Sequence, residues 1–228
     1  MAFLNTGGKQ TNYIFTVKMK THQDSIQIFQ KVWPHICSEC REVFGSELHY
    51  QAMIYRCFRE YGKVPVGQIG MNVKIWIDNP VTSFLRTREY YKHKDYRGGI
   101  EPVPDIVLFS PEIHGDFRRR NNENTFRSML LAIEVKASER ESSRLTPGEI
   151  CEDIQKLKAF RNEARRRRKN FVPTMVVLDT APIEKERMTS RSLEIILSEA
   201  KTNNVGLFYL APEFEKIQEW NISKLSIH

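Results

Sequence analysis

The chain has 228 residues, of which 40% are hydrophobic and 28% are charged. This balance is typical of a folded globular protein and excludes a disordered or fibrous one, and the length suits one domain with a sizeable core. The formal net charge of +7 favours a polyanionic partner, because clustered Lys and Arg side chains attract phosphate groups. Net charge alone fits a merely basic protein equally well.

The sequence carries no targeting or membrane signal. No apolar run approaches the length of a membrane span, and Met1–Gln10 lacks the basic start and long apolar core of a signal peptide. We therefore expect a cytoplasmic protein, and a prokaryotic, viral or mobile-element context is compatible with this.

The four cysteines include one CxxC motif, formed by Cys37 and Cys40. His35 and His49 are nearby as conceivable partners in a zinc site. Because a second CxxC or an HxxxH motif is missing, the preferred interpretation is buried free thiols in a reducing compartment.

Residues 1–37 are predicted to form an N-terminal extension of tail, strand and short helix. Asp24 or Ser25 can cap the helix, and Pro34 would help to end it. Residues 38–228 are expected to form the core domain. The strand is predicted from apolar residues that alternate with more polar ones: Tyr13, Phe15, Val17 and Met19.

A second helix is predicted between two glycines. Ser46 follows Gly45 and can act as the N-cap, and Gly62 can serve as the C-cap. Glu47 lies at the N-terminal end of the apolar stripe of this helix, so its carboxylate points towards the core.

Short runs of β-branched and bulky residues predict the strands Val66–Ile77, Pro104–Phe109, Leu130–Ala137, Phe171–Asp179 and Val205–Leu210. One further helix starts at the capping box Thr146–Glu149, and another covers Ser190–Lys201. Strands that alternate with helices indicate an α/β domain whose central mixed β-sheet is flanked by helices.

A charged constellation interrupts two of these strands. Glu134 and Lys136 are two residues apart and project from the same face of their strand. Asp105 lies in an otherwise apolar strand, where an unpaired carboxylate would cost several kcal/mol. If the two strands are neighbours, Asp105 and Glu134 converge beside Lys136, and carboxylate oxygens of this kind suit Mg²⁺.

This arrangement, Pro104-Asp105 followed by Glu134-Val135-Lys136 with Glu47 on a preceding helix, resembles the PD-(D/E)xK nuclease superfamily over roughly residues 46–210. The resemblance implies a restriction-endonuclease-like αβββαβ core and a divalent ion held by Asp105 and Glu134. It also implies that Lys136 assists the attacking water. Glu47 is the candidate fourth catalytic and metal-binding residue, and we expect it to approach from a helix packed over the same face.

Two more residues complete the predicted site. The backbone carbonyl of Val135 is a possible metal ligand, and Gln155 matches a polar position that the superfamily sometimes uses on the following helix. The expected cofactor is Mg²⁺, with Mn²⁺ able to substitute. The expected activity is that of a DNA endonuclease, and the expected assembly is a homodimer, because two strands need two cuts.

The interval between Asp105 and Glu134 is unusually long for this pattern. It contains Pro111–Ser128 with the basic run Arg118–Arg120, which is either a hairpin insertion that reaches DNA or a solvated loop. If Asp116 were the ligand in place of Asp105, the assignment would fail. The alternative functions are a catalytically inactive nucleic-acid-binding protein with a nuclease-like fold, and an α/β protein whose basic surface serves another anion.

Overall fold

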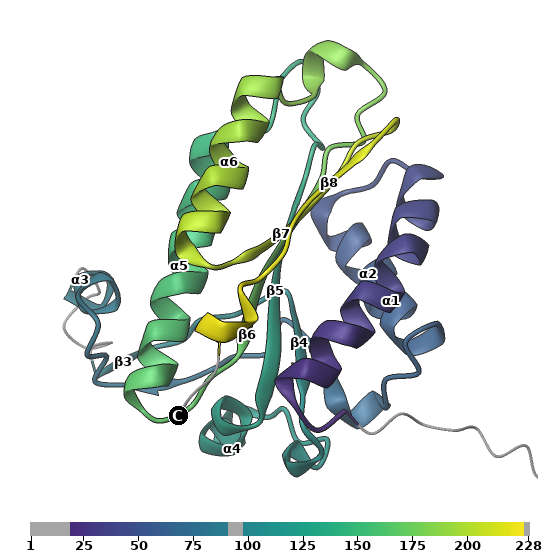
Figure 1. Ribbon diagram of the computed structural model, residues 1–228. Helices are drawn as coiled ribbons and strands as arrows, with labels where there is room; N and C mark the ends of the chain where they lie inside the picture. The colour runs from purple at the N-terminus through teal and green to yellow at the C-terminus, as the bar shows by residue number, and fades with distance from the viewer. Residues whose placement is uncertain (1–18, 91–97, 226–228) are drawn as a thin grey trace, which may run out of the picture.

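A computed structural model describes residues 19–90 and 98–225, and its centre is a mixed six-stranded sheet with the order β1-β4-β5-β6-β7-β8 (Figure 1). Strands β5, β6 and β7 run parallel to one another, and the other neighbours are antiparallel. The strands are β1 (Ile69–Met71), β4 (Ile106–Phe109), β5 (Met129–Ala137), β6 (Val172–Leu178), β7 (Gly206–Leu210) and β8 (Glu215–Gln218). The predicted class, an α/β domain with a mixed sheet flanked by helices, is confirmed.

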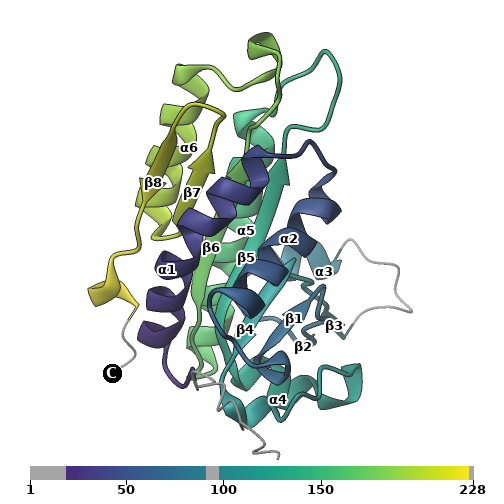
Figure 2. The same ribbon diagram turned by 90° about the vertical axis from the view of Figure 1, so that its right-hand side faces the viewer.

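Helices cover both faces of the sheet (Figures 1 and 2). Helices α1 (His22–Arg41) and α2 (Glu47–Glu60) lie on one face, and α5 (Pro147–Arg166) and α6 (Ser190–Asn203) lie on the other. None of the helices in the described ranges is long and apolar enough to cross a membrane. The short helices are α3 (Ser83–Tyr90), α4 (Asn122–Arg127), η1 (Val66–Gln68), η3 (Pro111–Ile113), η4 (Arg119–Asn121), η5 (Glu184–Glu186) and η6 (Ile222–Lys224).

Helix α1 is longer than predicted. Thr21 is its N-cap and forms a capping box with Asp24, and the helix continues through Pro34 to Arg41. An internal proline removes one backbone hydrogen bond at a cost of about 3 kcal/mol or more. Pro34 is exposed, whereas its neighbour Trp33 is buried, so packing of the apolar face against the sheet offsets that cost.

The predicted boundary between residues 37 and 38 falls inside α1. Buried residues of α1 share one apolar cluster with α2 and with β5, β6 and β7, so α1 belongs to the same core as the rest of the chain. Apart from Met19, the predicted strand over Tyr13–Met19 lies outside the described residues.

The predicted strand Val66–Ile77 is divided between two sheets. Its first part forms η1 and β1, and Asn72 then adopts a left-handed backbone with φ of 51°, which ends the strand. Its last residue, Ile77, starts β2 (Ile77–Asp78), which pairs with β3 (Gly99–Ile100) in a separate two-stranded sheet.

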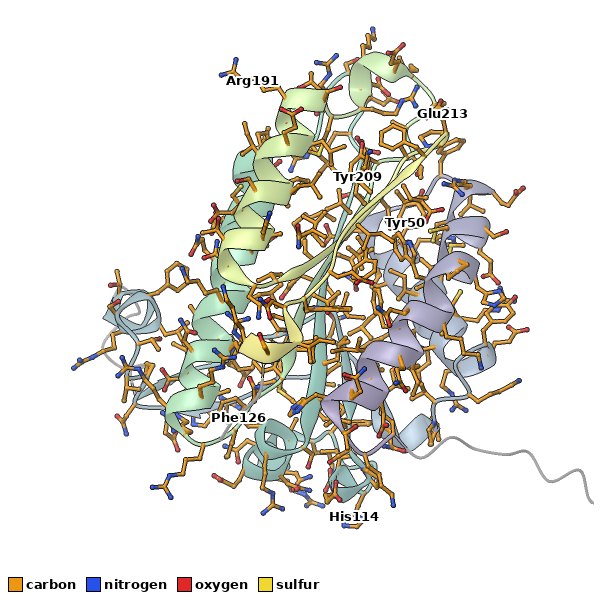
Figure 3. The ribbon with its side chains drawn as sticks, in the orientation of Figure 1. Tyr50, His114, Phe126, Arg191, Tyr209 and Glu213 are labelled. Carbon is orange, nitrogen blue, oxygen red and sulfur yellow. The ribbon has the colours of Figure 1, made fainter. Side chains whose placement is uncertain are left out.

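The segment over Pro111–Ser128 is neither a hairpin nor an irregular loop. It forms short helical turns and α4, and Phe126 of α4 stacks on Phe160 of α5 with ring centroids 5.6 Å apart. Figure 3 shows Phe126 at one end of the molecule and Tyr209 towards the other. The insertion therefore extends the core under the end of the sheet.

Candidate active site

The two strands that carry the predicted acids are neighbours. Strands β4 and β5 pair antiparallel with Ile106 opposite Ile133, and the continuation of this register sets Asp105 opposite Glu134. Directly opposed residues have Cβ atoms about 4.5–5.5 Å apart and face the same side of a sheet. This strand pairing therefore brings the carboxylates of Asp105 and Glu134 together, as predicted.

Asp105 is held at the point where β4 begins. Its carboxylate oxygen Oδ2 accepts a buried hydrogen bond of 2.7 Å from the backbone N–H of Val135. Only 8% of Asp105 is exposed. Its carboxylate takes the place of a backbone carbonyl as the acceptor for the N–H of Val135, because β4 does not extend this far along β5. Val135 therefore contributes its N–H to the organisation of the site, in addition to the carbonyl proposed from the sequence.

The alternation along β5 separates charged from apolar side chains. Leu131, Ile133 and Val135 pack into the cluster beneath α1 and α2. Because successive strand residues point to opposite faces, Glu134 and Lys136 belong to the face that α5 covers. This confirms the predicted shared face of the glutamate and the lysine.

Glu47 reaches the site by a different route from the one predicted. Helix α2 packs on the face of Val135, opposite to that of Lys136. Glu47 is the first residue of α2, after its N-cap Ser46, and its carboxylate meets the Lys136 ammonium at 3.1 Å. Strand β4 begins at Ile106, opposite Ile133, and does not reach the level of Lys136, so side chains from both faces can meet beside this part of β5.

Asp153 of α5 is a site residue that the sequence analysis missed. Its carboxylate lies 3.4 Å from Lys136 and 2.6 Å from Lys156, and only 6% of the residue is exposed. A signal was present in the sequence, because Asp153 is three residues after Ile150 and one before Ile154, on the inward side of an amphipathic helix. A carboxylate at such a position needs a cationic partner.

Burial, together with the charges of neighbouring carboxylates, determines the electrostatics of the cluster. Burial raises the pKa of Asp105 to about 6, and the nearby charges of Glu47 and Asp153 act in the same direction. Burial, followed by the charge of Asp105, also raises the pKa of Glu134 well above its ordinary value. Burial disfavours the Lys136 ammonium, but Asp153 and Glu47 outweigh it and raise its pKa, so the amine is charged at neutral pH.

These residues line an open cavity of about 590 Å³. Its polar part holds Glu47, Asp105, Glu134, Lys136, Asp153 and Lys156. The opposite wall is largely apolar and comes from α3, β3 and the segment that leads into β4. More carboxyl groups than ammonium groups face the cavity, so it can accept a further cation.

The donor set fits a hard divalent ion better than zinc, because it consists of carboxylate oxygens without histidine or cysteine. Throughout residues 19–90 and 98–225, no three His, Cys, Asp or Glu side chains already form a metal-binding arrangement. The ammonium of Lys136 lies against two of the cavity's carboxylates, those of Glu47 and Asp153. Burial is the main cause of the raised pKa of Asp105, and the excess of carboxylates over ammonium groups in the cavity lining leaves negative charge that a bound cation could balance.

Two other acidic or polar candidates lie elsewhere. The side-chain amide of Gln155 donates to Glu199 on α6, and Gln155 is outside the cavity, which corrects its predicted place in the site. Asp116 pairs with Arg118 at 2.6 Å, and this hydrogen bond lowers its pKa to about 2. Asp116 does not line the cavity, so it does not compete with Asp105 as the ligand.

The remaining motifs have structural partners. Cys37 and Cys40 are buried free thiols, as preferred from the sequence, and burial raises the pKa of Cys40 to about 12. In the basic run after α5, Arg167 pairs with Glu163 at 2.9 Å, and Lys169 pairs with Glu123 at 3.0 Å. Arg167 thus pairs within the C-terminal end of α5, and Lys169 connects the segment after α5 to α4.

Comparison of the chain with protein-family models, with curated proteins and with solved structures finds no match. Functional inference therefore depends on the chemistry of the cavity.

Proposed function

We propose that the protein is a metal-dependent endodeoxyribonuclease of the PD-(D/E)xK type. The observation that carries the proposal is the pairing of β4 with β5, which brings Asp105 opposite Glu134 with Lys136 on the same strand and Glu47 in contact with it. A buried aspartate, a half-buried glutamate and a lysine in an open cavity are groups that a phosphodiesterase can use. The basic pI of about 9.2 supports DNA as the partner.

The carboxylates of Asp105, Glu134 and Glu47 and the carbonyl of Val135 would hold Mg²⁺, which Mn²⁺ can replace. When bound, such an ion supplies Lewis acidity at a phosphate oxygen and makes a nearby water a better nucleophile. The hydrogen bond from Val135 fixes the orientation of Asp105, so this carboxylate need not reorganise during the reaction.

Lys136 is proposed to orient the attacking water and to neutralise negative charge that develops on the phosphate. Its raised pKa keeps the ammonium protonated, so it donates hydrogen bonds and does not act as a general base. Asp153 is proposed as a positioning residue, because its carboxylate contacts Lys136 from the side of α5.

The direct test is incubation of the purified protein with supercoiled plasmid in Mg²⁺ or in EDTA, followed by gel electrophoresis. Nicking or linearisation only in Mg²⁺ supports the proposal. A gel shift without cleavage supports the rival, a catalytically inactive nucleic-acid-binding protein with the same fold. Neither cleavage nor a shift would favour an α/β protein with another anionic partner.

The proposed assembly is a homodimer, since double-strand cleavage by one site per chain needs two copies related by symmetry. Light scattering of the protein alone and with a duplex oligonucleotide measures this separately from activity. A monomer under both conditions would limit the proposal to a nicking enzyme.

A further inference from the structure

A second hollow lies beside the candidate active site, at the edge strand β1. It encloses about 490 Å³, and its wall includes Tyr55 of α2 and Phe117, which lies between η3 and η4. Both aromatic residues are partly exposed. Lys74 and Arg119 lie at the same hollow, and their side chains are 60% and 67% exposed. The hollow thus combines aromatic surface with two cations within reach of solvent.

The hollow shares a wall with the candidate active site. The backbone N–H of Asn72, which lines the hollow, donates to the backbone carbonyl of Asp105 at 2.9 Å. Glu101 lines the active-site cavity and pairs with Lys74 at 3.3 Å and with Arg119 at 2.8 Å. The cavity and the hollow therefore meet at Glu101 and its two cationic partners.

The charge of this wall suits a phosphate chain. Two cations meet one carboxylate at Glu101, so the group retains positive charge. The guanidinium of Arg119 also lies over the ring of Trp76, 5.3 Å from its centroid, which extends the planar surface around the hollow. Phe117 packs on Phe109 of β4 with ring centroids 5.2 Å apart, so one aromatic wall is anchored to the sheet.

We propose, on the basis of the proposed nuclease function, that this hollow binds an unpaired DNA base next to the phosphate that is cleaved. Tyr55 and Phe117 offer aromatic surface for stacking, and Lys74 and Arg119 neutralise the adjoining phosphates. Bases within a duplex stack on one another and are not available to such a surface. The substrate class is therefore DNA with a single-stranded segment at the cut, such as a flap, a gap or a branch.

Binding is tested without metal, in EDTA, with a single-stranded oligonucleotide that carries the fluorescent base 2-aminopurine. We expect stacking in the hollow to quench its fluorescence in the wild-type full chain. Base stacking on an aromatic side chain contributes about 1 kcal/mol or more, so Phe117→Leu should weaken binding about fivefold or more. Arg119→Gln, at an exposed side chain, should weaken binding while leaving the melting temperature unchanged.

The matched control is Arg191→Gln, because Arg191 is an exposed cation on α6 towards the opposite end of the molecule from the insertion before α4 (Figure 3). This variant should bind as the wild type does. Equal affinity of the wild type, Phe117→Leu and Arg119→Gln, or stronger binding of continuous duplex than of the single strand, would overturn the inference.

Cleavage separates the failure of this inference from failure of the proposed function. In Mg²⁺ we expect a gapped or flapped duplex to be cut faster than a continuous duplex of the same sequence, and Arg119→Gln should reduce that preference. Equal cutting of both substrates would refute the base site and retain the nuclease. Absence of cutting on every substrate would refute the nuclease, and the fluorescence titration would still decide whether the hollow binds a base.

Discussion

Asp105 and Asp179 are two buried aspartates at strand ends, and both accept a hydrogen bond from a backbone N–H. Asp105 precedes β4 and accepts from Val135, whereas Asp179 follows β6 and accepts from Met188 at 2.7 Å. Asp179 also accepts a hydrogen bond of 2.6 Å from the hydroxyl of Tyr209 on β7. Their local hydrogen-bonding roles are alike.

The surroundings of the two aspartates differ. The hydrogen-bond donors to Asp179 are neutral groups, and the residue is fully buried. Asp105 faces a cavity together with Glu134 and Lys136, and burial, followed by the charges of Glu47 and Asp153, raises its pKa to about 6. A buried strand-end carboxylate therefore does not indicate a functional site by itself, and the charged groups around an open cavity are what make Asp105 the candidate.

The largest expected difference comes from truncation of each aspartate to alanine. Asp105→Ala should lower Mg²⁺-dependent DNA cleavage by about a hundredfold or more, because loss of a metal ligand removes several kcal/mol of transition-state stabilisation. Asp179→Ala should retain specific activity and lose about 2–4 kcal/mol of stability, because it leaves the N–H of Met188 and the hydroxyl of Tyr209 without their acceptor.

Cleavage rates of the folded fraction, together with urea unfolding curves, measure both quantities for each variant. The assignment of Asp105 as a metal ligand would be wrong if Asp105→Ala unfolds the protein while the residual native fraction keeps wild-type specific activity. Asp105 would then be a structural residue of the same kind as Asp179.

A smaller effect is expected from two neighbouring positions on α5. Asp153→Asn should reduce kcat about tenfold with little change in KM, because Lys136 loses one of its two carboxylate partners. Gln155→Ala is the matched control, since Gln155 bonds to Glu199 outside the cavity, and its kcat should remain within about twofold of the wild type. Partial recovery in Asp153→Glu would support a positioning role, and equal loss in the Asp153→Asn and Gln155→Ala variants would contradict it.

The smallest effect is a pH dependence of stability in metal-free protein. The pKa of Asp105 is about 6 in the folded state against 3.8 ordinarily, so the folded state holds more protons than the unfolded state between these values. The contribution of Asp105 to the free energy of unfolding is therefore highest at low pH and falls as pH rises from about 4 to 6.

Asp105→Asn removes this ionisation and should make the metal-free protein about 1–2 kcal/mol more stable than the wild type at pH 7.5, with no gain at pH 4. Urea unfolding in EDTA at the two pH values measures the difference. A gain for Asp105→Asn that is the same at both pH values would contradict the assignment.

Much of the fold and part of the site could be predicted from the sequence, because local patterns determine them. The alternation in β5 predicted the shared face of Glu134 and Lys136, and the capping box at Thr146 predicted the start of α5. The sequence offered the adjacency of β4 and β5 only as a condition for a shared site, and the pairing of the two strands meets that condition. These features depend on periodicity and on side-chain chemistry within a few residues.

Features that depend on tertiary packing were not predictable in this way. Packing of α1 on the sheet overrides the helix-ending tendency of Pro34, and the left-handed backbone of Asn72 divides a predicted strand. Strand β8 has the short, largely exposed sequence Glu215–Gln218, which carries no apolar alternation. Asp153 was missed because its partner Lys136 is distant in sequence and meets it only when α5 covers β5.

Anomalous scattering from Mn²⁺ soaked into crystals of the protein would locate the divalent ion that we propose Asp105 and Glu134 hold. We expect a peak between the carboxylates of Asp105 and Glu134, and no peak at this position in crystals of Asp105→Ala. A peak at Asp179 or elsewhere, with none at Asp105 at saturating Mn²⁺, would contradict it.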